Sequence, residues 1–145
     1  MLIAVDFDGT IVEHKYPQIG EERPFATEIL RKLIADRHKV VLWTLRTGDL
    51  LDEAVKWCAD RGVNFYAINN EHSQMFDEAK DPSFSCKLNA DVWIDDRNVG
   101  GLPDWPTIYK IITEHRSWEQ MIRKQVREQF AESKPPHPKW MFWKK

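Results

Sequence analysis

The sequence has little cysteine and no long apolar segment. Cys58 and Cys86 are the two cysteines among 145 residues, and they form no Cys-X-X-Cys spacing. This pattern excludes a disulfide framework and gives no indication of a zinc site. No uninterrupted apolar run approaches the roughly 18 residues that a membrane span needs. Because Asp6 interrupts the first apolar run before a signal-peptide core could form, we expect a soluble cytoplasmic protein.

The composition that remains is typical of one globular domain. The chain is 42% hydrophobic and 30% charged, and 145 residues are enough to bury a sizeable core. The formal net charge of −2 is unevenly spread: residues 107–145 hold 9 Lys or Arg and 4 Asp or Glu, whereas residues 1–106 hold 12 and 19. A basic C-terminal end attracts phosphate-rich partners, although exposed charge on a terminal helix is common without any function.

Short apolar runs alternate with amphipathic segments along the chain. The apolar runs end abruptly at polar residues and predict buried strands at 2–5, 39–43, 65–68 and 91–94. Apolar repeats and capping signals predict helices from Pro24, over 49–61, from Pro106 and from Ser117, with a weaker helix over 72–79. This alternation is typical of an α/β fold with a mainly parallel sheet and helices on both faces. Ligands in such folds bind beyond the carboxyl ends of the strands.

Polar residues gather at those strand ends, beginning with the first strand. Asp6 and Asp8 are two positions apart, and Gly9 allows the backbone to turn sharply after them. Two neighbouring carboxylates repel each other unless a cation neutralises them or one stays protonated. A hard divalent ion such as Mg²⁺ resolves this conflict because it prefers oxygen ligands. The alternative is an ordinary turn after a strand, where Asp and Gly are frequent.

Three further signals lie at equivalent places in the predicted fold. Thr44 follows the second strand, where its hydroxyl can donate a hydrogen bond to a phosphoryl oxygen. Lys87 precedes the last strand and can offset the charge of an anionic substrate, although a surface lysine is the commoner case. Asp95 and Asp96 close that strand, and their placement beside an apolar segment suggests metal ligation or hydrogen bonding to loop amides.

The order of these signals resembles a known family. Asp-Phe-Asp-Gly-Thr at 6–10, Thr44, Lys87 and the acid pair at 95–96 are similar to the four-motif pattern of the haloacid dehalogenase-like hydrolase superfamily, most of whose members are phosphatases. The match spans roughly residues 2–101. The resemblance implies a Rossmann-like three-layer α/β/α sandwich with a mainly parallel sheet.

The resemblance also implies a role for each carboxylate. Asp6 would be the nucleophile that forms an aspartyl-phosphate. Asp8 would protonate the leaving oxygen and then activate water. Mg²⁺ would be held by Asp6, by the backbone carbonyl of Asp8 and by Asp95. Asp96 would either bind the ion directly or contact the residues that do.

Other residues would bind the phosphoryl group and the rest of the substrate. Thr44 and Lys87 would bind the transferring phosphoryl group, and Lys87 would also orient Asp6. Four further positions near the expected mouth are candidate phosphate- or substrate-binding residues: Thr10, Arg46, Arg97 and Asn98. Taken singly, each of these is more often a solvated loop residue.

Superfamily members commonly carry a cap domain over the substrate, and this chain has no room for one. Thr44 lies 36 positions after Asp8, and Lys87 lies 43 positions after Thr44; the predicted elements fill most of both intervals. A small capless member is therefore implied. We expect a single catalytic domain over 1–131, with a core at 2–101 and C-terminal helices at 106–131, and a tail at 132–145.

The resulting hypothesis is a Mg²⁺-dependent phosphomonoester hydrolase acting on a small phosphorylated metabolite, such as a sugar phosphate or a nucleotide. A phosphotransferase passes through the same intermediate and stays an alternative. The open site and the basic C-terminal stretch allow a second hypothesis, a phosphatase of nucleic-acid ends, although no recognised nucleic-acid module is present. A third is a non-catalytic binding or regulatory protein with the same fold. A homo-oligomer is left open, and no membrane partner is expected.

Overall fold

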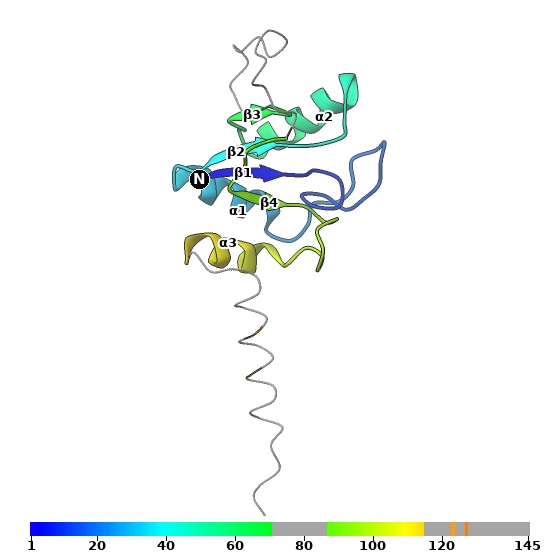
Figure 1. Cartoon of the computed structure of the whole chain (residues 1–145). Helices are drawn as coiled ribbons and strands as arrows, with labels where there is room; N and C mark the ends of the chain where they lie inside the picture. The colour runs from blue at the N-terminus through cyan, green and yellow to red at the C-terminus, as the bar shows by residue number, and fades with distance from the viewer. Residues whose placement is uncertain (71–86, 115–122, 124–126, 128–145) are drawn as a thin grey trace, which may run out of the picture. The chain divides into compact units, whose positions relative to one another are not determined.

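The structure is a computed structural model that describes residues 1–70 and 87–114, with residues 123 and 127 (Figure 1). The chain divides into two units, Met1–Tyr109 and Lys110–Lys145, and the sheet lies in the first. The predicted helix over 72–79 and the tail at 132–145 lie outside the described residues. The helix expected from Ser117 is described at residues 123 and 127 alone, and both are helical.

Four parallel strands form one sheet in the order β3-β2-β1-β4. Their bounds are Leu2–Val5 for β1, Lys39–Leu42 for β2, Ala67–Ile68 for β3 and Val92–Ile94 for β4. In register, Val5 lies opposite Leu42 on one side and Ile94 on the other. The predicted α/β fold with a parallel sheet is confirmed. The carboxyl ends of the strands consequently meet at one edge, although the strands come from distant parts of the chain.

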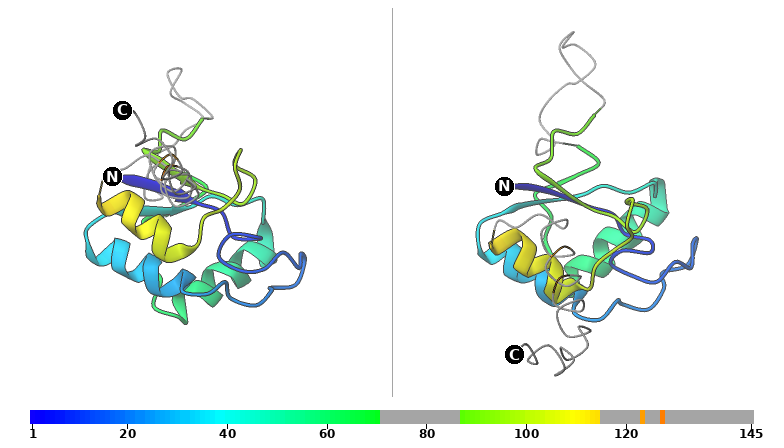
Figure 2. Two further views of the ribbon diagram at one scale, coloured as in Figure 1. Left: turned by 90° about the horizontal axis from the view of Figure 1, so that it is seen from below. Right: turned by 60° about the horizontal axis from the view of Figure 1, so that its bottom comes forward.

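In the described part of the first 114 residues, three helices accompany the sheet: α1 at Ala26–Ala35, α2 at Gly48–Ala59 and α3 at Trp105–Thr113. In both views of Figure 2, α1 and α2 lie on the same face of the sheet. This follows from the topology, because two right-handed crossovers that step in one direction, from β1 to β2 and on to β3, keep their helices on one side. The beginning of α3 lies beside the end of α1, where the Tyr109 hydroxyl donates a hydrogen bond to Asp36 at 2.9 Å.

Alternation along the strands divides the core between the two faces of the sheet. Ala4, Val41, Ala67 and Leu88 form a buried cluster on one face. The intervening side chains, including Ile3, Val5, Val40 and Leu42, point to the face that α1 and α2 cover, and all four are buried. Burying such an aliphatic side chain stabilises the fold by roughly 1.5–3 kcal/mol. The strands are thus apolar on both faces, which leaves their polar ends as the place for chemistry.

The first helix begins two residues later than its proline suggests. Phe25, at its N-cap, has a left-handed backbone with φ of 68°, so helical geometry begins at Ala26. The Glu22 side chain provides the missing acceptor: the backbone N–H of Thr27 donates to it at 3.0 Å, and the Thr27 hydroxyl donates at 2.6 Å. Glu22 therefore ties the loop after β1 to the start of α1.

No helix in the described part of the chain is both long and apolar enough to cross a bilayer.

Candidate active site

A pocket of about 670 Å³ opens where the four strands end. Each strand contributes a residue that follows it closely: Asp6 after β1, Thr44 after β2, Asn69 after β3 and Asp95 after β4. The sequence placed three of these four at this edge. A volume of this size is in the range of small-molecule sites, which run from about 300 to 1,000 Å³.

Three of the predicted carboxylates converge beside the pocket. Asp6, Asp95 and Asp96 each place one carboxylate oxygen within 4.8 Å of the others. One oxygen of Asp96, Oδ1, is buried and has no hydrogen-bond partner among the described residues. A buried, unpaired carboxylate oxygen is unfavourable unless something supplies positive charge. The donor set is all oxygen and carries several negative charges, so it fits a hard divalent cation such as Mg²⁺.

Burial and neighbouring charge both act on Asp6. The pKa of Asp6 is raised from 3.8 to about 6, mainly by burial and in smaller part by the charges of Asp95 and Asp96. Hydrogen bonds from the Phe7 backbone N–H and the Thr10 hydroxyl act in the opposite direction. The ionised form of Asp6 is therefore destabilised, as expected for a carboxylate that binds a cation. Perturbed carboxyl groups in a cleft are a frequent mark of functional sites.

Gly9 and Thr10 contact the acidic cluster and keep Asp6 and Asp96 close together. A Cβ at residue 9 would collide with the Asp96 carboxylate, and Gly9 has a φ of 96° that other residues rarely adopt. The fully buried Thr10 hydroxyl donates to Asp6 Oδ2 at 3.3 Å and accepts from the Asp96 backbone N–H at 2.9 Å. Trp105 in turn donates its indole N–H to the Thr10 carbonyl at 3.2 Å. Thr10, predicted as a phosphate-binding residue, thus joins the two strand ends instead of lining the pocket.

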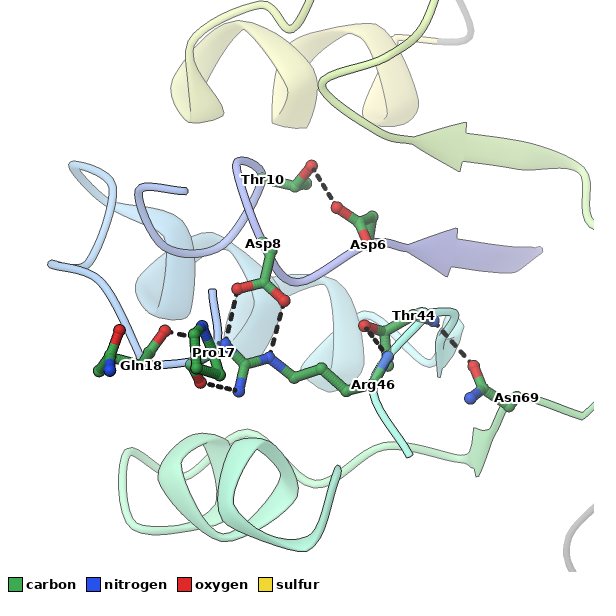
Figure 3. Close-up of polar contacts among 8 residues, drawn as sticks. All are labelled: Asp6, Asp8, Thr10, Pro17, Gln18, Thr44, Arg46 and Asn69. Carbon is green, nitrogen blue, oxygen red and sulfur yellow. Dashed lines mark hydrogen bonds and ion pairs between the residues drawn. The ribbon is translucent and has the colours of Figure 1, made fainter. Parts of the chain in front are cut away.

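The fourth predicted acid, Asp8, points elsewhere. Its carboxylate is turned toward Arg46, whereas the Asp6 carboxylate is turned toward Thr10 (Figure 3). Arg46 Nε donates to Asp8 Oδ2 and Arg46 Nη2 donates to Asp8 Oδ1, both at 2.7 Å. Asp8 lines the pocket but its carboxylate is not part of the acidic cluster. The cation ligand that the resemblance implied at this position is the Asp8 backbone carbonyl, and not this carboxylate.

Thr44 is fixed by its neighbours at the opposite wall of the pocket. Its backbone N–H donates to the Asn69 side-chain oxygen at 2.8 Å, and its hydroxyl oxygen accepts from the Arg46 backbone N–H at 3.2 Å (Figure 3). Asn69 has a left-handed backbone with φ of 51°, which asparagine tolerates better than most residues. An Asn directly after the third strand was the available sequence signal for this contact.

The remaining predicted residues differ in whether they line the pocket. Arg97 lines the pocket, and its backbone N–H donates to Asp95 Oδ1 at 2.8 Å. Asn98 uses its side-chain amide to donate to the Trp93 carbonyl at 3.2 Å. Lys87 is exposed, and among the described residues neither Lys87 nor Asn98 belongs to the pocket lining.

The loop after β1 forms a wall of the pocket. His14 and Tyr16 line it from this loop, and Trp43 and Leu45 add apolar surface beside Thr44. Trp43 and Leu45 were not predicted as site residues, because an apolar residue near a strand end is usually part of the core. Leu45 is 82% exposed, so here it faces the opening.

The fold and the site define an α/β protein whose all-parallel sheet carries a candidate cation site and a small-molecule pocket at its carboxyl edge. A solved structure of a conserved protein from Bacteroides thetaiotaomicron is 54% identical in sequence, with a TM-score of 0.77 over 83% of this chain and 96% of the other. The chain belongs to the same family as that conserved protein. No protein-family model and no curated protein matches the chain.

Proposed function

We propose that the protein is a Mg²⁺-dependent phosphomonoester hydrolase that acts on a small phosphorylated metabolite through an aspartyl-phosphate on Asp6. The observation that carries this proposal is the convergence of Asp6, Asp95 and Asp96 within 4.8 Å beside a pocket of about 670 Å³. The motif order supports a capless member of the haloacid dehalogenase-like superfamily. In that fold, a second helical layer would cover the sheet face opposite α1 and α2.

Asp6, Asp95, Asp96 and the Asp8 carbonyl are the groups that would hold the cation. When bound, a divalent cation neutralises the carboxylates and withdraws charge from the phosphoryl oxygens. Asp6 must be ionised to act as a nucleophile. Its pKa of about 6 leaves it mostly ionised at pH 7, and a neighbouring cation would favour the carboxylate further.

The residues of the chain divide the reaction between them. An oxygen of Asp6, held in place by the Thr10 hydroxyl, attacks phosphorus, and the bond from phosphorus to the leaving oxygen breaks. Asp8 lines the same pocket and, when it carries a proton on one carboxylate oxygen, would transfer that proton to the leaving oxygen. Asp8 then takes a proton from water, which attacks the aspartyl-phosphate and restores Asp6. Thr44 and Arg97 are the donors beside the phosphoryl group.

Phosphate release from p-nitrophenyl phosphate and from a panel of sugar phosphates and nucleotides tests the proposal. We expect release that requires Mg²⁺, and a loss of about 10³-fold or more in Asp6→Asn because the nucleophile is removed. Asp52→Asn is the matched control, since Asp52 is an exposed acid on α2 outside the pocket lining. The proposal fails if folded wild-type protein releases no phosphate from any substrate with Mg²⁺ present. It also fails if Asp6→Asn retains the activity.

A further inference from the structure

Arg46 is a fully buried arginine at the wall of the pocket. Its side chain has 0% exposure, and an ionised group in such a place is costly unless its donors are satisfied. Two donors go to Asp8, as described above. Two more reach backbone carbonyls: Nη1 donates to Pro17 and Nη2 donates also to Gln18, both at 3.0 Å (Figure 3).

Two aromatic rings complete the surroundings of this guanidinium. The Arg46 Cζ atom lies 5.1 Å from the ring centre of Phe7 and 5.4 Å from that of Tyr16. Both distances are within the range of cation–π attraction, about 6 Å. Phe7 precedes Asp8 in the β1 loop, whereas Tyr16 precedes Pro17 in the wall of the pocket. One side chain therefore contacts the acid–base candidate and the pocket wall together.

The wall segment, defined here as residues 13–22, closes at its base and is held by Arg46 near its tip. At its base, the Glu13 backbone N–H donates to the Glu21 carbonyl at 2.8 Å, and Val12 bridges to Glu22. Near its tip, Arg46 binds the carbonyls of residues 17 and 18. Tyr16, which is 55% exposed, thereby keeps a fixed place at the pocket opening.

We propose that Arg46 is the positioning residue of this site, coupling the wall segment to Asp8. Arg46 acts by holding the wall segment and Asp8 in place, and not by binding the phosphoryl group. Both oxygens of Asp8 are bound, so the direction of its side chain is set by the same guanidinium that holds residues 17 and 18. This inference rests on the proposed phosphatase function. In that function, Arg46 would order the wall segment and the acid–base group Asp8 together.

Lysine cannot replace arginine in this arrangement. A guanidinium is planar and presents its donors in a fixed fork, which matches the two oxygens of a carboxylate and leaves donors for the carbonyls. An ammonium retains the charge and loses the fork. Arg46→Lys therefore separates geometry from charge, and Arg37→Lys is the matched control on an exposed arginine outside the pocket lining.

A double-mutant cycle between Arg46→Lys and Asp8→Asn tests the coupling, with p-nitrophenyl phosphate and an alkyl phosphate as substrates. The nitrophenolate leaves without a proton, whereas the alkoxide needs one from Asp8. We expect Arg46→Lys to lower kcat/KM, which reports phosphoryl transfer to Asp6 and not the later attack by water, by about tenfold or more on the alkyl phosphate and clearly less on the aryl phosphate. In the double variant, we expect almost no loss beyond that of Asp8→Asn, because the two residues act as a unit. Arg37→Lys should leave both rates unchanged.

Amide hydrogen exchange of the wall segment provides a second measurement that needs no activity and no Arg46 variant. Asp8→Asn weakens the partner at the far end of the guanidinium, so we expect exchange at residues 13–22 to become about tenfold faster. Asp6→Asn is the matched control, because Asp6 is a neighbouring acid whose carboxylate accepts a hydrogen bond from Thr10 instead of Arg46.

The outcomes distinguish this inference from the proposed function. If wild-type protein is active but the two losses simply multiply, or if Arg46→Lys affects both substrates equally, the coupling is refuted while the phosphatase stands. Unchanged exchange in Asp8→Asn also refutes it, and this arm decides the matter if Arg46→Lys does not fold. If wild-type protein releases no phosphate, the proposed function and the inference fail together.

Discussion

At the scale of single residues, the Asp6 carboxylate is in a position that disfavours its ionised form. Its pKa is raised from 3.8 to about 6, first by burial and then by Asp95 and Asp96. Between these two pH values, the native protein holds a proton that the unfolded chain has released. Stability therefore falls as the pH rises through this window, and the full penalty is present above it.

Asp6→Asn removes that penalty, and its effect on stability should depend on pH. In metal-free protein, we expect the variant to melt at a higher temperature than wild type above pH 6, with the difference shrinking toward pH 4. Thermal unfolding between pH 4 and 8 in the presence of a chelator measures this. Asp52→Asn should show no comparable pH-dependent difference, since that acid is exposed. An Asp6→Asn difference that is the same at both ends of the range would contradict the argument.

Residue spacing predicted the acids but not the direction of each side chain. Asp6, Asp95 and Asp96 could be placed together because the carboxyl ends of parallel strands meet at one edge. The Asp8–Arg46 pair could not be foreseen, since it depends on how the loop after β1 returns past the end of β2. Arg46 was predicted to contact the substrate, and its charge is instead neutralised by a carboxylate inside the protein.

At the scale of elements, the strands and helices lie close to their predicted places, and local backbone geometry explains the differences. The predicted strand at 39–43 ends at Leu42, and the one at 65–68 keeps only Ala67–Ile68. The first helix begins after a left-handed Phe25, which no helix propensity indicates. Its amphipathic spacing was nevertheless sufficient to predict that a helix follows Pro24.

Glu22 is the residue on which the start of α1 depends. Glu22→Ala removes the acceptor for both the backbone N–H and the hydroxyl of Thr27, a residue that is 7% exposed. We expect a loss of about 1–2 kcal/mol in the free energy of unfolding, which chemical denaturation would measure. Glu21→Ala changes the neighbouring exposed acid and should have little effect. Equal losses in the two variants would mean that the Thr27 contacts contribute nothing specific.

At the scale of the whole molecule, a cation bound at the acidic cluster would join the ends of β1 and β4. Ligands that bind only the native state stabilise it by mass action, by about 2.7 kcal/mol at a concentration one hundred times the dissociation constant. We therefore expect added Mg²⁺ to raise the melting temperature of wild-type protein, more strongly at pH 8 than at pH 5, where Asp6 is mostly protonated.

Asp95→Asn provides the comparison for this shift. It removes one charge from the cluster and should lose most of the Mg²⁺-dependent rise, whereas Asp52→Asn should retain it. Differential scanning fluorimetry with a Mg²⁺ titration is sufficient to measure the three proteins. A rise of equal size in all of them would indicate a general salt effect and no site at this edge.

The strand order also determines when the site comes into being during synthesis. β1, which carries Asp6, is made first and has its partner β2 soon afterwards, but its other neighbour β4 is made much later. A growing chain can hold three paired strands and still lack Asp95 and Asp96. The acids meet only when β4 adds along β1, a long-range pairing of the kind that forms slowly. Under the proposed function, a nascent chain in which β4 has not yet paired would therefore have no phosphatase activity. The onset of cation binding would then report that β4 has paired with β1.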